Sequence, residues 1–342
     1  MTSKGEIQTL QITKEMVQGA LSFEQGDDWL KPWRLPFDEI ELFHPELVVR
    51  AEMCAGVRLR FRTDSTKIAL ELALPGAVKD DNDRVTRFDL TTGPDLLASI
   101  QAEEGETLIT FSGLSGEKTY ELWLPLMVPC KLSSLHLDKG ALFEIPKDPR
   151  TRWLTYGSSI SHCGDAHSPA RSWPAIVART HNLDLTCLGY GGNCHLETVV
   201  GRVLRDTPAD IITMKLGINT TCSLSERTFR SAAMGLVKLV REKQPDIPIG
   251  LISPIINSPR ESIDIENGHN LQSMRQTLEQ SVEILQKYGD DKIEYFNGLN
   301  IIGSADTSCL PDELHPDGNG YQLMGARIAD YVLGPLLQKY IT

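Results

Sequence analysis

Basic runs, long apolar runs and signal-peptide features are all missing from this sequence. No run of Lys and Arg is longer than a pair, and 46 acidic against 34 basic residues give a net charge of -12. Nucleic-acid binding needs a basic stripe that releases counterions, so we expect no nucleic-acid partner. No apolar stretch approaches the roughly 20 residues that cross a bilayer, and the polar residues 1–11 lack the apolar core of a signal peptide. We therefore expect no membrane association and a cytoplasmic location.

Paired cysteine motifs are missing as well. The seven cysteines form an odd set without CxxC spacing, which suits free thiols in a reducing compartment better than a disulfide framework. An exported protein with one or two disulfides stays open as an alternative. The cysteines are Cys54, Cys130, Cys163, Cys187, Cys194, Cys222 and Cys309.

The length and composition are those of an ordinary globular protein with about two domains. The chain has 342 residues, of which 41% are hydrophobic and 23% charged, and domains average roughly 150 residues. Residues 57–62 and 68–72 alternate between apolar and polar side chains around a polar turn at 63–66, which predicts a β-hairpin. Further short strands are predicted at 87–90, 107–111, 119–124 and 132–137. Residues 1–148 therefore read as an all-β sandwich, most simply a jelly roll.

Strands and helices alternate in residues 149–342. Pro146 and Pro149 stiffen the linker, and a capping box from Ser223 to Glu226 predicts the start of a helix that continues to Val240. This pattern predicts a doubly wound, flavodoxin-like parallel sheet of five strands with helices on both faces. The five predicted strands cover residues 152–156, 183–188, 211–216, 249–252 and 293–296.

Residues suited to acyl transfer follow the predicted strands, where an open parallel sheet binds its ligands. Asp312 and His315 lie three residues apart, so the carboxylate can orient the imidazole. An oriented His can take a proton from Ser159, which follows the first strand and then attacks an acyl carbonyl. The developing oxyanion needs donors, which the N–H groups of Ser159 and Gly192 and the amide of Asn219 can supply.

The segments that contain Ser159, Gly192, Asn219 and His315 resemble, in this order, the four sequence blocks of the SGNH hydrolases. This family is also called GDSL-type esterases and acylhydrolases. The resemblance covers about residues 151 to 342 and is most specific in the run Asp312-Glu313-Leu314-His315-Pro316. It implies that Ser159 is the nucleophile, His315 the base and Asp312 its orienting carboxylate. It also implies that Ser159, Gly192 and Asn219 form the oxyanion hole. These roles coincide with those argued from the residues.

The sequence departs from the usual pattern of that family at two positions. Ser158 stands where the family usually has Asp before the nucleophile, and Thr220 replaces the Asp that commonly follows Asn219. We expect these changes to alter loop support more than chemistry. The Gly-Ser-Ser-Ile start behind a β-sandwich is similar to a subgroup with acyltransferases of natural-product pathways, and to carbohydrate esterases with a jelly-roll front domain.

The same residues allow other interpretations. The α/β-hydrolase elbow needs Gly-x-Ser-x-Gly, whereas residue 161 is Ser and Asp312 lies too close to His315 for that fold. The polar segment 254–269 is equally compatible with a lid and with a solvated excursion. Two loops rich in possible zinc ligands follow Ser159 and Gly192, although their spacing matches no standard zinc motif and favours a supporting role at the pocket. Their residues are His162, Cys163, Asp165, His167, Cys194, His195 and Glu197.

The first functional hypothesis is a serine esterase or acylhydrolase that cleaves a soluble O-acyl ester through an acyl-Ser159 intermediate. Its substrate would be a small-molecule ester or an acylated sugar, and it would need no cofactor or metal. An acyltransferase with an alcohol acceptor would use the same residues. A non-catalytic carbohydrate-binding protein, acting through the β-sandwich, is the alternative from another class. The oligomeric state is left open by the sequence.

Overall fold

The computed structural model describes residues 6–75, 86–103, 105–221, 223–263 and 269–341. These residues group into two compact units. The first contains residues 1–38, 51–150 and 168–170, and the second contains residues 39–50, 151–167 and 171–342. Residues 39–50 therefore group with the second unit, although they precede most of the first in the sequence.

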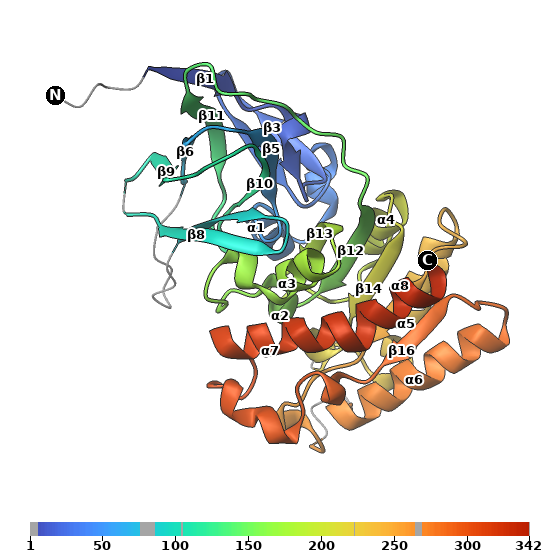
Figure 1. Cartoon of the computed structure of the whole chain (residues 1–342). Helices are drawn as coiled ribbons and strands as arrows, with labels where there is room; N and C mark the ends of the chain where they lie inside the picture. Colours follow the sequence, from blue (N-terminus) through green and yellow to red (C-terminus); the bar gives the residue numbers. More distant parts are fainter. Residues whose placement is uncertain (1–5, 76–85, 104, 222, 264–268, 342) are drawn as a thin grey trace. The chain divides into compact units, whose positions relative to one another are not determined.

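Two antiparallel sheets form the first unit (Figure 1). One sheet has the order β3-β4-β11-β6-β9 with β1 paired to β11, and the other has the order β2-β5-β10-β7-β8. The strands are β1 (Ile7–Gln11), β2 (Val17–Gln18), β3 (Ser22–Gln25), β4 (Leu30–Trp33), β5 (Arg58–Thr63), β6 (Lys67–Ala73), β7 (Arg87–Thr92), β8 (Asp95–Gln101), β9 (Leu108–Ser112), β10 (Lys118–Trp123) and β11 (Lys131–Asp138). The all-β prediction for this part of the chain is confirmed.

Alternating apolar side chains from both sheets make a shared core. Leu59 and Phe61 of β5 and Leu122 of β10 face Leu70 of β6 and Leu135 of β11, and all five are fully buried. Burial of this kind stabilises a sandwich by roughly 25 cal/mol for each Å² of apolar surface removed from water. The predicted strands at 87–90, 107–111, 119–124 and 132–137 correspond to β7, β9, β10 and β11.

The predicted hairpin between residues 57–62 and 68–72 is wrong. β5 pairs with β2 and β10, whereas β6 pairs with β9 and β11, so the two strands lie in different sheets. Thr66, in the connection, donates its backbone N–H and its hydroxyl to Asp138 of β11, both at 2.7 Å. These bonds direct the chain toward the other sheet. Alternation marks which face of a strand is buried but does not identify the strand's neighbours.

A parallel sheet with the order β13-β12-β14-β15-β16 lies at the centre of the second unit. Its strands are β12 (Thr151–Gly157), β13 (Leu183–Gly189), β14 (Ile211–Lys215), β15 (Ile249–Ile252) and β16 (Ile293–Phe296). All five strands agree with the prediction to within one residue at each end. The doubly wound, five-stranded prediction is confirmed.

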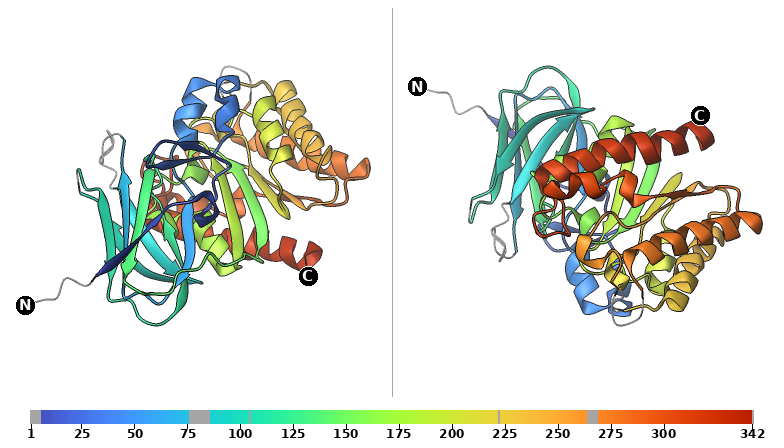
Figure 2. Two further views of the ribbon diagram at one scale, coloured as in Figure 1. Left: turned by 90° about the horizontal axis from the view of Figure 1, so that it is seen from above. Right: turned by 90° about the horizontal axis from the view of Figure 1, so that it is seen from below.

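Helices cover both faces of the parallel sheet, as Figure 2 shows. One face carries α3, α7 and α8, and the other carries α4, α5 and α6. The α-helices of the chain are α1 (Pro45–Ala51), α2 (Ser159–His162), α3 (Trp173–Thr180), α4 (Thr198–Asp206), α5 (Glu226–Arg241), α6 (Leu271–Lys287), α7 (Gly318–Ile328) and α8 (Gly334–Tyr340). Short turns are η1 (Lys14–Met16), η2 (Phe37–Leu42), η3 (Pro169–Arg171), η4 (Ile218–Thr220), η5 (Ser258–Arg260), η6 (Gly298–Asn300), η7 (Ser304–Cys309) and the π turn η8 (Ala329–Leu333).

The N-cap of α5 differs from the predicted one. Ser225 caps the helix and its hydroxyl accepts the N–H of Thr228, whereas Ser223 had been expected to do so. The hydroxyl of Ser223 instead contacts Nδ1 of His195 at 3.2 Å. The helix therefore begins two residues later than predicted, and Ser223 makes a tertiary contact.

No helix among the residues that the structure describes is long and apolar enough to cross a membrane. The six described cysteines are free thiols. Cys222 lies outside the described residues.

Candidate active site

Three neighbouring strands of the parallel sheet end at the same level. Gly157 at the end of β12 is in register with Gly189 at the end of β13 and with Lys215 at the end of β14. The loops that follow these strands therefore begin side by side. They carry Ser159, Gly192 and Asn219 of the predicted site.

Ser159 is the first residue of α2 and is partly exposed, whereas Ser158 and Ile160 on either side are buried. The hydroxyl of Ser158 accepts the N–H of Ile160 at 3.3 Å and caps the short helix. Ser158 thus supplies the cap that a short acidic side chain at this position could also provide. Gly157 leaves room for the turn, because a Cβ there would lie 2.3 Å from Oγ of Ser161.

Ser159, His315 and Asp312 form a chain of hydrogen bonds. The distance between Oγ of Ser159 and Nε2 of His315 is 2.8 Å, and that between Nδ1 of His315 and Oδ2 of Asp312 is 2.7 Å. The carboxylate accepts the Nδ1 proton, which leaves the Nε2 lone pair directed at the serine hydroxyl. The arrangement therefore suits proton removal from Ser159.

Asp312 is fixed by the backbone as well as by the imidazole. Its Oδ1 accepts the N–H groups of His315 at 2.6 Å and Leu314 at 3.0 Å. Partial burial acts to raise the pKa of Asp312, but these bonds and the bond to the His315 ring outweigh it and hold that pKa below its usual value. Asp312 is consequently a carboxylate at neutral pH.

Two of the three predicted oxyanion donors lie on the loops after β13 and β14. Gly192 is exposed with a φ of 74°, and no heavy atom lies within 4 Å of the position of a Cβ there. Asn219, in η4, accepts the N–H of Cys194 with Oδ1 at 3.0 Å. This bond orients the amide so that Nδ2 is the end that can donate to a substrate. Thr220 closes the same turn by donating its hydroxyl to the carbonyl of Gly217 at 2.7 Å.

Two histidines hold the loop that contains Gly192. Nδ1 of the buried His162 accepts the N–H of Gly191 at 3.2 Å, and Nε2 of His195 donates to the carbonyl of Gly192 at 3.0 Å. Both residues belong to the set weighed as possible zinc ligands. Within the described ranges, no group of three or more His, Cys, Asp or Glu side chains is placed to hold a metal ion.

Arg50 lies beside the same loop, although it comes from a distant part of the sequence. Its Cδ and Nε lie 3.7 Å from the position of a Cβ on Gly191, and residues 39–50 group with this second unit. The predicted β-sandwich, residues 1–148, includes this segment. No local pattern indicates that Arg50 lies beside Gly191, because about 140 residues separate the two.

Comparison with known proteins identifies both parts of the chain. Residues 16–132 match the SsfX3 N-terminal domain, and residues 151–331 match the GDSL-like lipase/acylhydrolase family. No curated protein matches the chain significantly in sequence.

Solved structures similar to this chain span both units. The salicylyl-acyltransferase SsfX3 from a tetracycline biosynthetic pathway is 28% identical, with a TM-score of 0.87 and coverage of 96% of this chain and 98% of that one. A protein described as a GDSL-like lipase from Bacteroides ovatus is 21% identical, with a TM-score of 0.78 and 98% coverage of both chains. A family two carbohydrate esterase from Clostridium thermocellum, in complex with cellohexaose, is 14% identical, with a TM-score of 0.66 and coverage of 94% and 99%. The last two similarities concern the fold alone.

The family match covers more than half of the 342 residues. It includes all the residues that form the hydrogen-bonded chain and the two donor loops. The protein belongs to the GDSL-like lipase/acylhydrolase family.

Proposed function

We propose that this protein is a serine-dependent acyl-transfer enzyme that acts on a soluble O-acyl ester through an acyl-Ser159 intermediate. The observation that carries the proposal is the continuous chain from Ser159 through His315 to Asp312, with bonds of 2.8 and 2.7 Å. Nucleophile, base and orienting carboxylate stand in the order that serine acyl transfer requires.

In the acylation step, Nε2 of His315 takes the proton of Ser159 as Oγ attacks the ester carbonyl. The carbonyl oxygen becomes an oxyanion, and the N–H groups of Ser159 and Gly192 and Nδ2 of Asn219 donate to it. Donors held in place before the reaction stabilise this charge without reorganisation. The imidazolium of His315 then protonates the leaving alcohol, and the acyl group stays on Ser159.

In the second step, His315 removes a proton from water, which attacks the acyl-Ser159 ester. This step releases the acid and restores the serine, so that the net reaction is hydrolysis. An acceptor alcohol can take the place of water with the same residues, and the net reaction is then acyl transfer. Exclusion of water and access for the acceptor decide between the two.

Acyl transfer to an alcohol is a second candidate for the same site. It is supported by the similarity of both units to a salicylyl-acyltransferase, which extends over 96% of this chain. Hydrolysis and transfer can be separated by product partition. With p-nitrophenyl acetate as donor, a hydrolase releases acetate at a rate that added alcohols leave unchanged, whereas a transferase forms the acetylated alcohol.

The experiment that tests the shared proposal is trapping of the intermediate. Rapid acid quenching during turnover of p-nitrophenyl acetate should leave an acetyl group on the peptide that contains Ser159. Acetylation at other residues only, in a protein that still turns over the ester, would contradict the proposal. Ser172→Ala, which changes a buried serine of the same unit, is the control and should leave the acetyl group on the Ser159 peptide.

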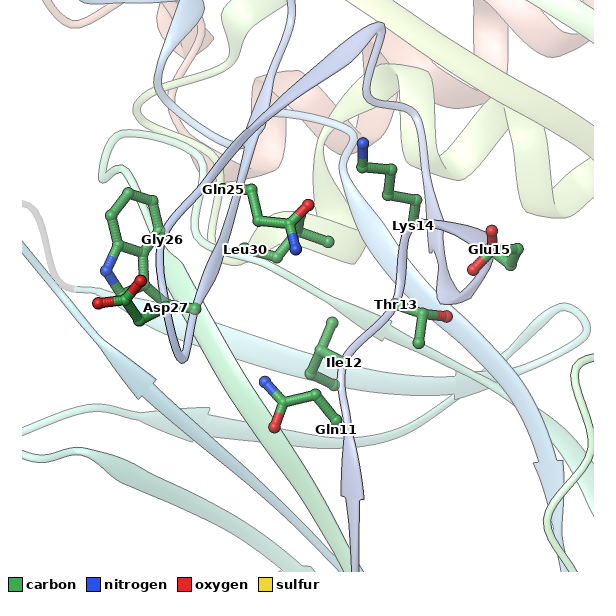
Figure 3. Close-up of a pocket in the computed structure, with 10 residues that line it drawn as sticks. Gln11, Ile12, Thr13, Lys14, Glu15, Gln25, Gly26, Asp27 and Leu30 are labelled. Atoms are coloured by element: carbon green, nitrogen blue, oxygen red, sulfur yellow. The ribbon is translucent and has the colours of Figure 1, made fainter.

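Carbohydrate binding by the first unit is a further candidate, supported by a separate cavity of about 330 Å³ (Figure 3). Ile12 and Leu30 form its buried apolar floor, and the amides of Gln11 and Gln25 and the ring of Trp29 line it. The Lys131 ammonium lies 4.0 Å from the centre of the Trp29 ring, so the two amides and the apolar floor are the groups that suit a sugar, which presents hydroxyl groups beside apolar C–H surface. Glycan binding that survives Ser159→Ala and is lost in Gln25→Ala would support this function.

A further inference from the structure

The first residues after β15 are attached to α6. Residues 254–257 are buried, and residues 258 and 259 are exposed. Arg275 of α6 donates to the carbonyls of Pro254 at 2.9 Å and Ile255 at 3.1 Å. The remainder of the predicted loop includes residues 264–268, which lie outside the described residues.

An ion pair completes this attachment. Two nitrogens of the Arg275 guanidinium donate to the two carboxylate oxygens of Glu261 at 2.7 and 2.8 Å, and the exposed fraction of the Arg275 side chain is only 6%. Oε1 of Glu261 also accepts the backbone N–H of Asn257 at 3.1 Å. A bidentate ion pair of this kind fixes the position of the Glu261 carboxylate. The carboxylate in turn holds the backbone of Asn257.

Asn257 connects this segment to the loop that carries Asp312 and His315. Its side chain is 4% exposed, and Nδ2 donates to the carbonyl of Glu313 at 2.6 Å. Only the nitrogen of the amide can lie that close to a carbonyl oxygen, so the orientation of the side chain is determined. The bond therefore links a braced segment to the residue that follows Asp312.

Glu313 needs such support because of its backbone conformation. It has a φ of 62°, in the left-handed region that residues with a side chain rarely adopt. This turn allows Asp312 to receive the N–H groups of Leu314 and His315 and the ring N–H of His315. A relaxed Glu313 would move Asp312 relative to His315, and displacements of about 1 Å at a catalytic group can cost roughly a hundredfold in rate.

We propose that Asn257 is a positioning residue of the active site, which acts through the carbonyl of Glu313 to hold Asp312 against His315. The proposal rests on the proposed function of Ser159, His315 and Asp312. Asn257 itself does not act on the substrate, so its loss should lower kcat and leave KM nearly unchanged.

The test is a double-mutant cycle between Asn257→Ala and Asp312→Ala, since coupled residues give non-additive losses. The readouts are kcat with p-nitrophenyl acetate and the rate at which a fluorophosphonate labels Ser159. Asn257→Ala should lower both by about tenfold to a hundredfold in the native background, and by less than about threefold when Asp312 is already Ala. A general structural defect would instead give the same loss in both backgrounds, and that result would overturn the proposal.

One further variant serves as a control, and another replaces Asn257→Ala if that protein does not fold. Asn300→Ala removes an asparagine whose Nδ2 donates to the hydroxyl of Tyr331, on an exposed turn, and should change the labelling rate by less than about twofold. Asn257→Ser replaces Asn257→Ala if the latter does not fold, and the same pattern is expected of it. If the native protein is labelled and Asn257 variants are labelled equally fast, this proposal alone fails. If folded native protein is not labelled at Ser159, the proposed function fails and this proposal with it.

Discussion

The N–H of Gly191 donates to Nδ1 of His162 over a distance of 3.2 Å. His162 lies in α2, one helical turn after Ser159. The segment that carries the nucleophile and the loop that carries the Gly192 donor are therefore bonded to each other. Because Nδ1 accepts, the proton of the neutral ring is on Nε2. Correct spacing between nucleophile and oxyanion donor thus depends on an imidazole that makes no contact with the reacting atoms in the proposed mechanism.

Replacement of His162 should reduce both activity and stability. His162→Ala removes the acceptor for Gly191, so we expect kcat to fall by about tenfold to a hundredfold while KM changes little. The free energy of unfolding should fall by about 1 to 3 kcal/mol, since a partly buried N–H loses its partner. Steady-state kinetics and urea unfolding measure the two effects. His181→Ala, which removes a bond to the carbonyl of Ala329, is the control and should leave kcat unchanged.

Asn219→Ala should affect the chemical step rather than substrate binding. Its Nδ2 is proposed to bond the oxyanion, which exists only in the transition state and intermediate. We expect kcat to fall by about two to three orders of magnitude with little change in KM. A variant with normal kcat and a raised KM would show that the amide binds the ground state instead.

Lys215 provides a test of stability against pH. Burial lowers the pKa of Lys215 from 10.5 to about 8, and no carboxylate in the described part of the chain forms an ion pair with it. Between pH 8 and 10.5 the unfolded chain binds more protons at this residue than the folded one, so stability rises with pH through this window. Relative to Lys215→Met, the native protein should gain about 2 kcal/mol between pH 8 and 10. The free energy of unfolding is measured with urea at each pH. If it changed with pH by the same amount in the two proteins over this range, the result would be inconsistent with a desolvated amine.

Chelation tests the remaining alternative for the two histidine-rich loops. His162 and His195 bond the backbone of the Gly191–Gly192 loop, and we expect activity to be independent of metal. Prolonged treatment with EDTA followed by desalting should leave kcat with p-nitrophenyl acetate unchanged. Activity that is lost on this treatment and returns with zinc would require a metal site.

Local patterns predicted most of the fold because the elements of the second unit are strongly periodic. Phe229, Ala233, Leu236 and Val240 recur on one face of α5 and are all buried there. The cap of the same helix was misplaced because Ser223 and Ser225 have the same side chain, and in the structure Ser223 contacts His195 whereas Ser225 accepts the N–H of Thr228. Pairing in the first unit failed for a similar reason, since alternation in β5 and β6 gives their buried faces but not their partners.

The site residues follow from local sequence signals, whereas the contacts that hold them do not. Position at the ends of strands predicted Ser159, Gly192 and Asn219, and a three-residue spacing predicted the pairing of Asp312 with His315. The bonds of His162 to Gly191 and of Asn257 to Glu313 could not be predicted, because each joins segments far apart in sequence. Asn257 lies 56 residues from Glu313, and its residue type alone suggests nothing more than a loop.

The most direct test of the account is the intact mass of the protein after exposure to a fluorophosphonate, with native protein and Ser159→Ala treated in parallel. Ser158→Ala is the matched control, because it removes the neighbouring hydroxyl, which caps α2 and does not attack the substrate in the proposed mechanism. We predict one adduct on the native protein and on Ser158→Ala, and none on folded Ser159→Ala. An adduct that persists in Ser159→Ala, or its absence from folded native protein, would contradict an activated nucleophile at Ser159.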